Sequence, residues 1–179
     1  MSPVFQASLS RKTITVIQGN YAVSDDPEVV MTTVLGSCVA VCLFDPKAGV
    51  GGMNHFLLAT HGDAQNTDLK YGVNAMELLI NKVLQAGASR QHLQAKLFGG
   101  ARMTDHSRDI GDTNAKFSIA FLEREEIACT SKSLGGDKAR RVQFHPFSGA
   151  ARQMQISGLA PDVENPRPVP RPASDITLF

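Results

Sequence analysis

The spacing of apolar residues along the chain predicts mainly strands. Apolar and β-branched residues form short runs that end at glycine, proline or aspartate, which is typical of strands bounded by turns. The expected strands are residues 12–18, 30–35, 38–44, 53–58, 96–98, 127–131 and 141–144, with an edge strand at 153–156. Turn residues separate the run at 38–44 from the run at 53–58, and the run at 127–131 from the run at 141–144. Each of these two pairs is therefore expected to form a hairpin.

Two segments have helical spacing instead. Between residues 68 and 85 the apolar side chains recur at three- and four-residue intervals, and Gly87 stands where a helix cap favours glycine. Residues 113–126 place phenylalanine and leucine on one side and three glutamates toward solvent. The pattern therefore predicts an α+β fold, a layered sandwich of mostly antiparallel sheet flanked by helices.

The C-terminal end of the chain differs in composition from the rest. Five prolines follow residue 158, and proline can neither donate to a sheet ladder nor continue a helix. We therefore expect a single domain over residues 1–157, followed by a proline-rich flexible tail over residues 158–179.

Composition and charge exclude several classes of protein. The 179 residues carry 18 Lys and Arg against 17 Asp and Glu, a net charge of +1 without a basic stripe, which argues against a nucleic-acid binder. The longest apolar run, 34–44, is shorter than the ~18–20 residues of a spanning helix, so no membrane insertion is expected. Because the first residues also lack an export signal, a cytoplasmic protein is expected. Three cysteines in that compartment favour thiols over disulfides.

The spacing of Cys38, Cys42, His55 and His61 satisfies the rule for a zinc finger with two cysteines and two histidines. The match is discounted because both cysteines lie in a strand-like run, where four residues span roughly 13 Å. Two thiolates so far apart cannot share one ion. The chain also lacks a phosphate-binding glycine motif and a Gly-x-Ser-x-Gly elbow, so neither a metal nor a cofactor is expected.

Cys38 and His55 form the candidate catalytic pair. A thiol becomes a useful nucleophile when a nearby imidazole or backbone N–H groups lower its pKa. A loop at 45–48 would pair residues whose numbers sum to 93, which places Cys38 opposite His55 on one face of the hairpin. A register shift of one residue would put them on opposite faces. The residues alone leave open a packing role for Cys38, and either Thr32 or Thr33 could orient the imidazole.

The sequence around this pair reads Thr-Thr-Val-Leu-Gly-Ser-Cys-Val-Ala-Val-Cys-Leu-Phe-Asp-Pro at 32–46 and Gly-Gly-Met-Asn-His-Phe-Leu-Leu at 51–58. These stretches resemble the CheD family of chemoreceptor glutamine deamidases. The resemblance continues at 97–101, 110–114 and 134–142 and covers residues 12–157. One departure is Thr113, which stands where the family usually has arginine; if that arginine helps to dock a substrate, docking differs here.

The resemblance implies a papain-like Cys-His-Thr triad on a layered scaffold. Carried over by position, Cys38 is the nucleophile, His55 the base and Thr32 the orienting threonine, with Thr33 as the alternative. It further implies that the resting pair is imidazolium and thiolate, and that backbone N–H groups near Ser37 and Cys38 hold the oxyanion. The implied reaction is hydrolysis of glutamine side chains to glutamate through a cysteine thioester.

The implied substrates are the cytoplasmic helices of methyl-accepting chemotaxis receptors. Some relatives also bind and stimulate a CheC-type phosphatase, so a non-catalytic regulatory adaptor is an alternative function. Hydrolysis of receptor glutamyl methyl esters is a second alternative, because it would pass through the same acyl-enzyme. An adaptor would not need Cys38, whereas both enzymatic functions would.

Overall fold

The computed structural model describes residues 11–58, 65–105 and 108–157. The predicted tail at 158–179 lies outside the described residues. In chain order the elements are β1 (Lys12–Thr15), β2 (Tyr21–Ser24), β3 (Val29–Leu35), β4 (Val39–Asp45), β5 (Val50–Phe56), α1 (Gln65–Gln85), the 3-10 helix η2 (Arg90–His92), β6 (Gln94–Gly99), α2 (Arg108–Arg124), β7 (Ala128–Leu134), β8 (Ala139–His145) and β9 (Ala150–Ile156).

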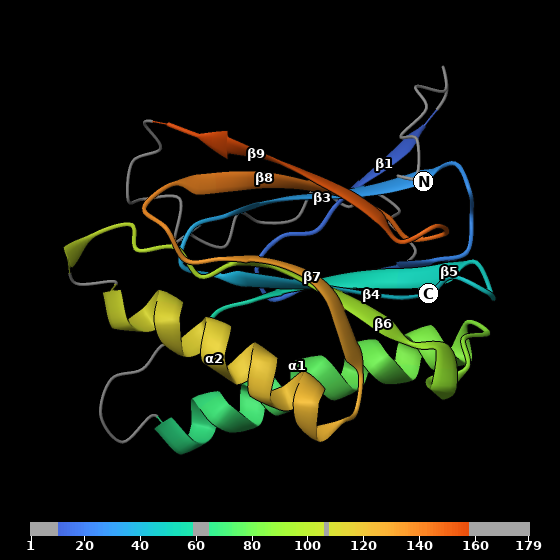
Figure 1. The fold of residues 1–179 in the computed structure, drawn as a ribbon, viewed down its shortest axis with the longest axis horizontal. Coiled ribbons are helices and arrows are strands. Elements are labelled where there is room, and N and C mark those ends of the chain that lie inside the picture. The colour runs from blue at the N-terminus through green and yellow to red at the C-terminus, as the bar shows by residue number, and fades with distance from the viewer. Residues whose placement is uncertain (1–10, 59–64, 106–107, 158–179) are drawn as a thin grey trace, which may run out of the picture.

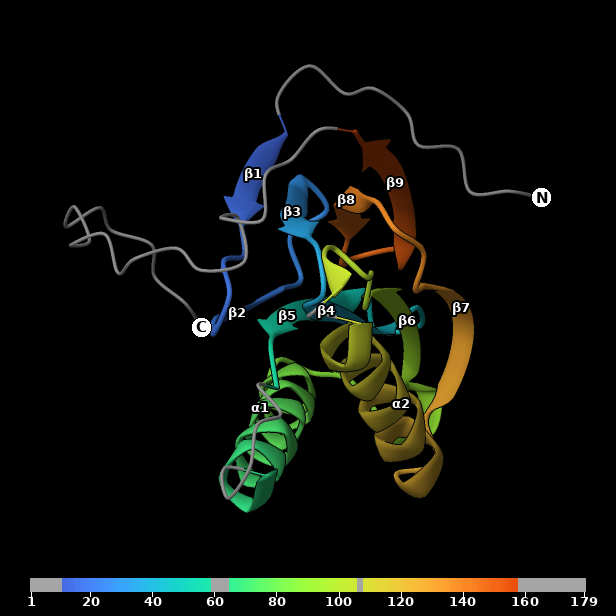
Figure 2. The same ribbon diagram turned by 90° about the vertical axis from the view of Figure 1, so that its left-hand side faces the viewer.

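These elements form three layers (Figure 1). One sheet has the strand order β1-β3-β8-β9 and the other has the order β2-β5-β4-β6-β7. The two sheets face each other, and both helices cover the opposite face of the second sheet (Figure 2). The predicted α+β class is confirmed. Both sheets are mixed, because β1 runs parallel to β3 and β6 runs parallel to β7.

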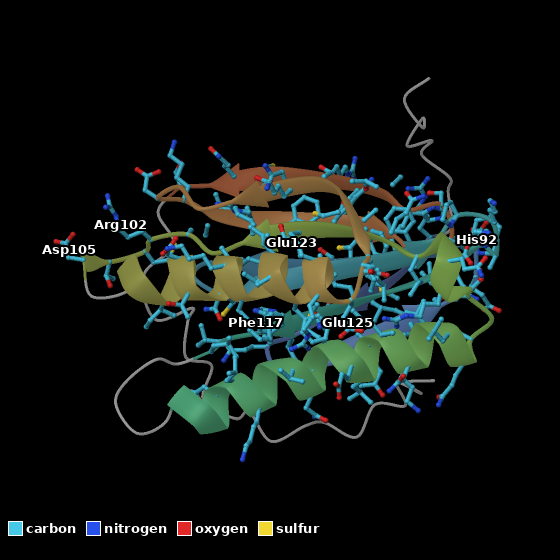
Figure 3. All side chains as sticks on the ribbon, turned by 60° about the horizontal axis from the view of Figure 1, so that its bottom comes forward. His92, Arg102, Asp105, Phe117, Glu123 and Glu125 are labelled. Carbon is cyan, nitrogen blue, oxygen red and sulfur yellow. The ribbon has the colours of Figure 1, made fainter. Side chains whose placement is uncertain are left out.

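One hydrophobic core lies between each pair of adjacent layers. The core between the helices and the five-stranded sheet contains Val39, Val41 and Leu43, whereas the core between the two sheets contains Ala40, Cys42 and Phe44. All of β4 is therefore buried, with alternate side chains in different cores. This central position explains why the run is apolar without alternation. Phe117 extends from α2 toward α1 (Figure 3) and meets the ring of Phe56 edge-on, with centroids 5.9 Å apart.

The predicted β4–β5 hairpin is present, but its register differs from the predicted one by two residues. Ala40 lies opposite His55 and Asp45 lies opposite Val50, so the numbers of two paired residues add up to 95 and not to the predicted 93. The Asp45 carboxylate accepts hydrogen bonds from the backbone N–H groups of Lys47 and Ala48, at 2.8 and 3.1 Å. Because this side chain organises the turn from the last position of the strand, the loop is 46–49 and not 45–48.

The second predicted hairpin is wrong. β7 joins the five-stranded sheet beside β6, whereas β8 joins the other sheet between β3 and β9. The glycine-rich connection between them crosses from one sheet to the other. The buried guanidinium of Arg140 holds this connection by donating hydrogen bonds to the carbonyl oxygens of Ser133 and Gly135. Two strands bounded by glycines are compatible with either arrangement, so the pattern could not distinguish them.

The remaining elements agree with the pattern in most places. The helix at 68–85 lies within α1, and the edge strand at 153–156 lies within β9 at the border of its sheet. β2 was not predicted, and the first strand ends at Thr15 instead of continuing to residue 18. Within the described residues, the helices are too short or too polar to cross a membrane.

Candidate active site

The two candidate catalytic residues both belong to the layer between the sheets. Cys38, directly before β4, is 3% exposed, and His55, on β5, is 6% exposed. The register shift of two residues keeps them on one face, because side chains alternate with a period of two. Cys38 precedes Ala40, the partner of His55, by two positions. Among the described residues, no hydrogen bond joins the thiol to the imidazole, because His55 Nε2 has no hydrogen-bond partner.

Hydrogen bonds to Nδ1 determine the tautomer of His55. The Thr33 hydroxyl donates to the Val16 carbonyl oxygen at 2.6 Å, and its Oγ1 lies 2.9 Å from His55 Nδ1. The same carbonyl oxygen lies 3.3 Å from Nδ1. Because the hydroxyl proton points to Val16, both neighbours of Nδ1 are acceptors, and Nδ1 carries the proton. Nε2 is then the basic nitrogen, and it has no hydrogen-bond partner among the described residues.

The surroundings of His55 favour its neutral form. Burial lowers the pKa of His55 to about 4, although the hydrogen bond to Val16 opposes the shift. The resting imidazole is therefore neutral near pH 7 and not the imidazolium that the family resemblance implies. The physical reason is that Nδ1 faces a hydroxyl and a carbonyl oxygen, which are neutral acceptors and offset little of the desolvation.

The structure places Thr33, and not Thr32, beside the base. Consecutive residues of a strand point to opposite faces, and on β3 the inward positions are those of Met31, Thr33 and Leu35. The Thr32 hydroxyl instead donates to the carbonyl oxygen of Val142, at 3.0 Å, on the neighbouring strand β8. The expectation that Thr32 contacts the imidazole is therefore wrong. The sequence did not reveal which of the two adjacent threonines faces the second sheet.

A turn at residues 17–20, which the sequence analysis missed, completes the surroundings of the pair. Asn20 N–H donates to the Ile17 carbonyl oxygen at 3.0 Å, and Gly19 adopts a φ of +85° that other residues rarely adopt. Gln18 Oε1 accepts a hydrogen bond from Cys38 Sγ at 3.4 Å. The visible indication in the sequence was the Gln-Gly-Asn run, whose turn chemistry argues against a strand that continues to residue 18.

Asn114 on α2 is a second residue to which the sequence gave no role. Its side chain is fully buried, and Oδ1 accepts a hydrogen bond from the Leu58 N–H at 2.7 Å. Its Nδ2 donates to the Ser37 carbonyl oxygen at 3.2 Å. Ser37 precedes Cys38 and Leu58 follows β5, so one amide joins the two segments that carry Cys38 and His55.

Glycine at position 99 allows the backbone of Cys38 to approach β6. A Cβ at Gly99 would collide with the carbonyl oxygen of Cys38, and its φ of +113° also disfavours any side chain. The next N–H, that of Gly100, donates to this carbonyl oxygen at 2.8 Å. The Gly99-Gly100 pair thus serves backbone packing at the site.

Comparison with known proteins identifies the family. The family model described as CheD chemotactic sensory transduction matches residues 57–155. "Probable chemoreceptor glutamine deamidase CheD 1" of Ruegeria sp. (strain TM1040) is 47% identical to this chain over the full length of both. This chain belongs to the CheD family.

Other CheD relatives have similar identity. "Probable chemoreceptor glutamine deamidase CheD" of Agrobacterium fabrum is 50% identical, covering 94% of this chain and 97% of its own. The protein of that name from Caulobacter vibrioides is also 50% identical, and the match covers 92% of this chain and 91% of its own. Among solved structures, the hypothetical protein YfiH of Bacillus licheniformis aligns with 63% of this CheD chain and 49% of its own, at 14% identity and a TM-score of 0.43.

The other two cysteines of this CheD chain lie in different surroundings. Cys42 is fully buried on β4, and burial raises the pKa of its thiol. Cys129 on β7 is exposed, and its thiol donates to the Ser131 carbonyl oxygen at 3.4 Å. Among the described residues, no group of three or more His, Cys, Asp or Glu is placed to hold a metal ion. His61, the last residue of the zinc-finger spacing, lies outside the described residues.

A surface groove of about 710 Å³ lies beside the segment that contains Cys38 in this CheD chain. Its lining includes Gly100, whose N–H binds the Cys38 carbonyl oxygen, and Arg102, which lies near the start of α2 (Figure 3). The rest of the lining comes from α2, from the end of β7 and from the loop that connects the two sheets, namely Asp112, Ala115, Leu134, Gly135, Gly136 and Asp137.

Proposed function

We propose that this chain is a hydrolase that converts glutamine side chains of chemotaxis receptors to glutamate. Its relatives of similar length are named as probable chemoreceptor glutamine deamidases. The observation that carries the proposal is the arrangement around His55. Nδ1–H of His55 is hydrogen-bonded to Thr33 and Val16, so Nε2 is the ring nitrogen that can take a proton. This ring lies in the same layer as Cys38.

In the proposed papain-like triad, Cys38 is the nucleophile, His55 is the general acid and base, and Thr33 orients the ring. During attack, the Sγ proton moves to Nε2 while Sγ bonds to the side-chain carbon of the substrate glutamine. His55 becomes positively charged only at this stage. The hydrogen bonds from Nδ1–H to Thr33 and Val16 strengthen as the charge develops, and they therefore favour the transition state over the resting enzyme.

The remaining steps return the enzyme to its starting state. The imidazolium donates its Nε2 proton to the substrate nitrogen, the carbon–nitrogen bond breaks, and ammonia leaves behind a thioester with Cys38. Neutral His55 then takes a proton from water while the resulting hydroxide attacks the thioester carbon. The carbon–sulfur bond breaks, the thiolate regains its proton, and the glutamine has become glutamate with the uptake of one water molecule.

With receptor helices as substrates, the reaction would take place in the cytoplasm. The target glutamines would lie on the cytoplasmic helices of the receptors, and each turnover would replace a neutral amide by a carboxylate. A CheC-type phosphatase as a second partner stays a prediction from the family resemblance.

The decisive experiment incubates the purified chain with a cytoplasmic receptor fragment. Ammonia release and mass spectrometry of receptor peptides together detect conversion of glutamine to glutamate. Cys38→Ala and His55→Ala should abolish conversion, whereas the control variants Cys42→Ala and Cys129→Ala should retain most of it. If Cys38→Ala still deamidates, the proposed enzyme is wrong. Wild-type protein that binds the receptor or a CheC-type phosphatase without releasing ammonia would support the adaptor instead, and release of methanol from a methylated receptor would show the esterase.

A further inference from the structure

Gln18 is a polar residue in contact with the nucleophile that the mechanism above does not use. Its side-chain oxygen accepts the hydrogen bond from Cys38 Sγ at 3.4 Å. The side chain is half-buried, and it reaches the sulfur from the turn between β1 and β2, which is distant in sequence from the hairpin that carries Cys38 and His55.

The backbone of this turn is attached directly to the base. Gly19 N–H donates to the His55 carbonyl oxygen at 2.7 Å, and His55 N–H donates to the Asn20 carbonyl oxygen at 3.1 Å. These two bonds are made by the two residues that follow Gln18, and they place the turn against β5 as if it were part of the sheet. The same segment supplies the Val16 carbonyl oxygen that binds Nδ1. The position of Gln18 relative to the base is therefore set by the main chain and established before a substrate binds.

A carboxamide suits both the resting state and the reacting state. It carries one acceptor and two N–H donors, so it can accept from the thiol and donate to an anion after rotation about its last side-chain bond. During attack the negative charge develops on the oxygen of the carbon that is bonded to Sγ. Oε1 now lies 3.4 Å from Sγ, and rotation about the last side-chain bond brings the N–H donors to that position, close to the developing oxyanion. In a buried site, a neutral donor stabilises this charge more than water does.

We propose that Gln18 is a further catalytic residue, whose side-chain N–H groups donate a hydrogen bond to the oxyanion of the tetrahedral intermediate. Gln18 keeps all its atoms and protons throughout the reaction. The inference rests on the proposed function, because the oxyanion exists only if Cys38 attacks a carbonyl carbon.

The test compares kcat and KM for deamidation of the receptor fragment by Gln18→Ala, by Gln18→Glu and by the control Ile17→Ala. Ile17 is a neighbour in the same turn and is 56% exposed. Loss of an oxyanion donor lowers kcat by about 10²–10³-fold. We expect Gln18→Ala to lose kcat by about 100-fold with a KM within about threefold of wild type, and Ile17→Ala to match wild type.

The Gln18→Glu variant separates hydrogen-bond donation from packing, because it keeps the shape of the side chain. A carboxylate cannot donate, so this variant should lose at least as much kcat as Gln18→Ala at neutral pH. Its kcat relative to wild type at the same pH should rise as the pH is lowered, because a protonated carboxyl group can donate again. Circular dichroism and thermal melts of each variant check that the fold is retained.

Three results would overturn the inference. Gln18→Ala with kcat within threefold of wild type, or a loss confined to KM, would show that Gln18 does not act on the transition state. Conversion of Gln18 itself to glutamate in wild type but not in Cys38→Ala, detected by mass spectrometry, would make it a substrate of the nucleophile. Wild-type protein that releases no ammonia would remove the proposed function as well, and this failure is visible before any Gln18 variant is measured.

Discussion

The two adjacent threonines of β3 allow a sharp test of how the base is oriented. Thr33 accepts the hydrogen bond from His55 Nδ1 at 2.9 Å, whereas Thr32 faces away and binds the Val142 carbonyl oxygen at 3.0 Å. Substitution of either residue by valine removes one hydroxyl and keeps the branched shape. Thr33→Val and Thr32→Val are therefore matched variants, and only the first alters the surroundings of the base.

The expected size follows from the contacts of Nδ1. A hydrogen bond to a charged group contributes about 1.5–3 kcal/mol, and His55 is charged in the transition state of the proposed reaction. The Val16 carbonyl oxygen, 3.3 Å from Nδ1, remains as a second acceptor in Thr33→Val, so we take the lower part of this range. At about 1.4 kcal/mol per factor of ten, kcat should fall roughly 10- to 30-fold in Thr33→Val. Thr32→Val loses one hydrogen bond distant from the ring and should keep kcat within about threefold.

The assay is steady-state ammonia release from a receptor fragment, with thermal melts of each variant alongside. Thr33→Ser restores a hydroxyl at the same position and should recover most of the lost kcat, which separates orientation of the ring from packing. Equal losses in both valine variants, or a larger loss in Thr32→Val, would contradict the assignment of Thr33 as the residue that orients the imidazole.

Three further predictions concern stability. Asn114→Ala removes two buried hydrogen bonds, to the Leu58 N–H and to the Ser37 carbonyl oxygen, so it should lower the free energy of unfolding by about 2–4 kcal/mol in urea titrations. The control Asp112→Ala loses an exposed ion pair with Lys116 and should change the free energy of unfolding by less than about 0.5 kcal/mol. Equal effects of the two variants would contradict the bridging role of Asn114. The pKa of His55 is about 4 in the folded state and 6.5 ordinarily, so the unfolded state takes up a proton first as the pH falls. The stability due to this residue is therefore present above pH 6.5 and lost between pH 6.5 and 4. Between pH 7 and pH 4, the wild type should lose on the order of 3 kcal/mol of unfolding free energy through His55, as measured by urea unfolding at the two pH values. This loss should be absent in His55→Gln. If His55→Gln has the same pH dependence as wild type, the prediction is refuted. Truncation after residue 157 should leave the melting temperature and the deamidation rate unchanged, and a lower melting temperature would show that the proline-rich segment packs on the domain.

Some features of this protein were determined by the local sequence. β4 is apolar from Val39 to Phe44 because both of its faces are buried, and the helical spacing between 68 and 85 follows from one buried face of α1. The residues around Cys38 and His55 were sufficient to indicate the family. The hairpin register was not determined in this way: the predicted pairing of Cys38 with His55 is wrong by two residues, an even error that leaves both side chains on the same face.

Other features were decided by contacts between distant parts of the chain. The packing of two sheets decided that Thr33, and not Thr32, meets the imidazole. The Asn114 side chain binds backbone groups 56 and 77 residues away. A hydrogen bond of this kind leaves no periodic trace in the sequence, because periodicity records only which face of an element is buried. Which particular polar groups meet inside that buried layer depends on how the sheets and helices are stacked, and only the tertiary structure contains that information.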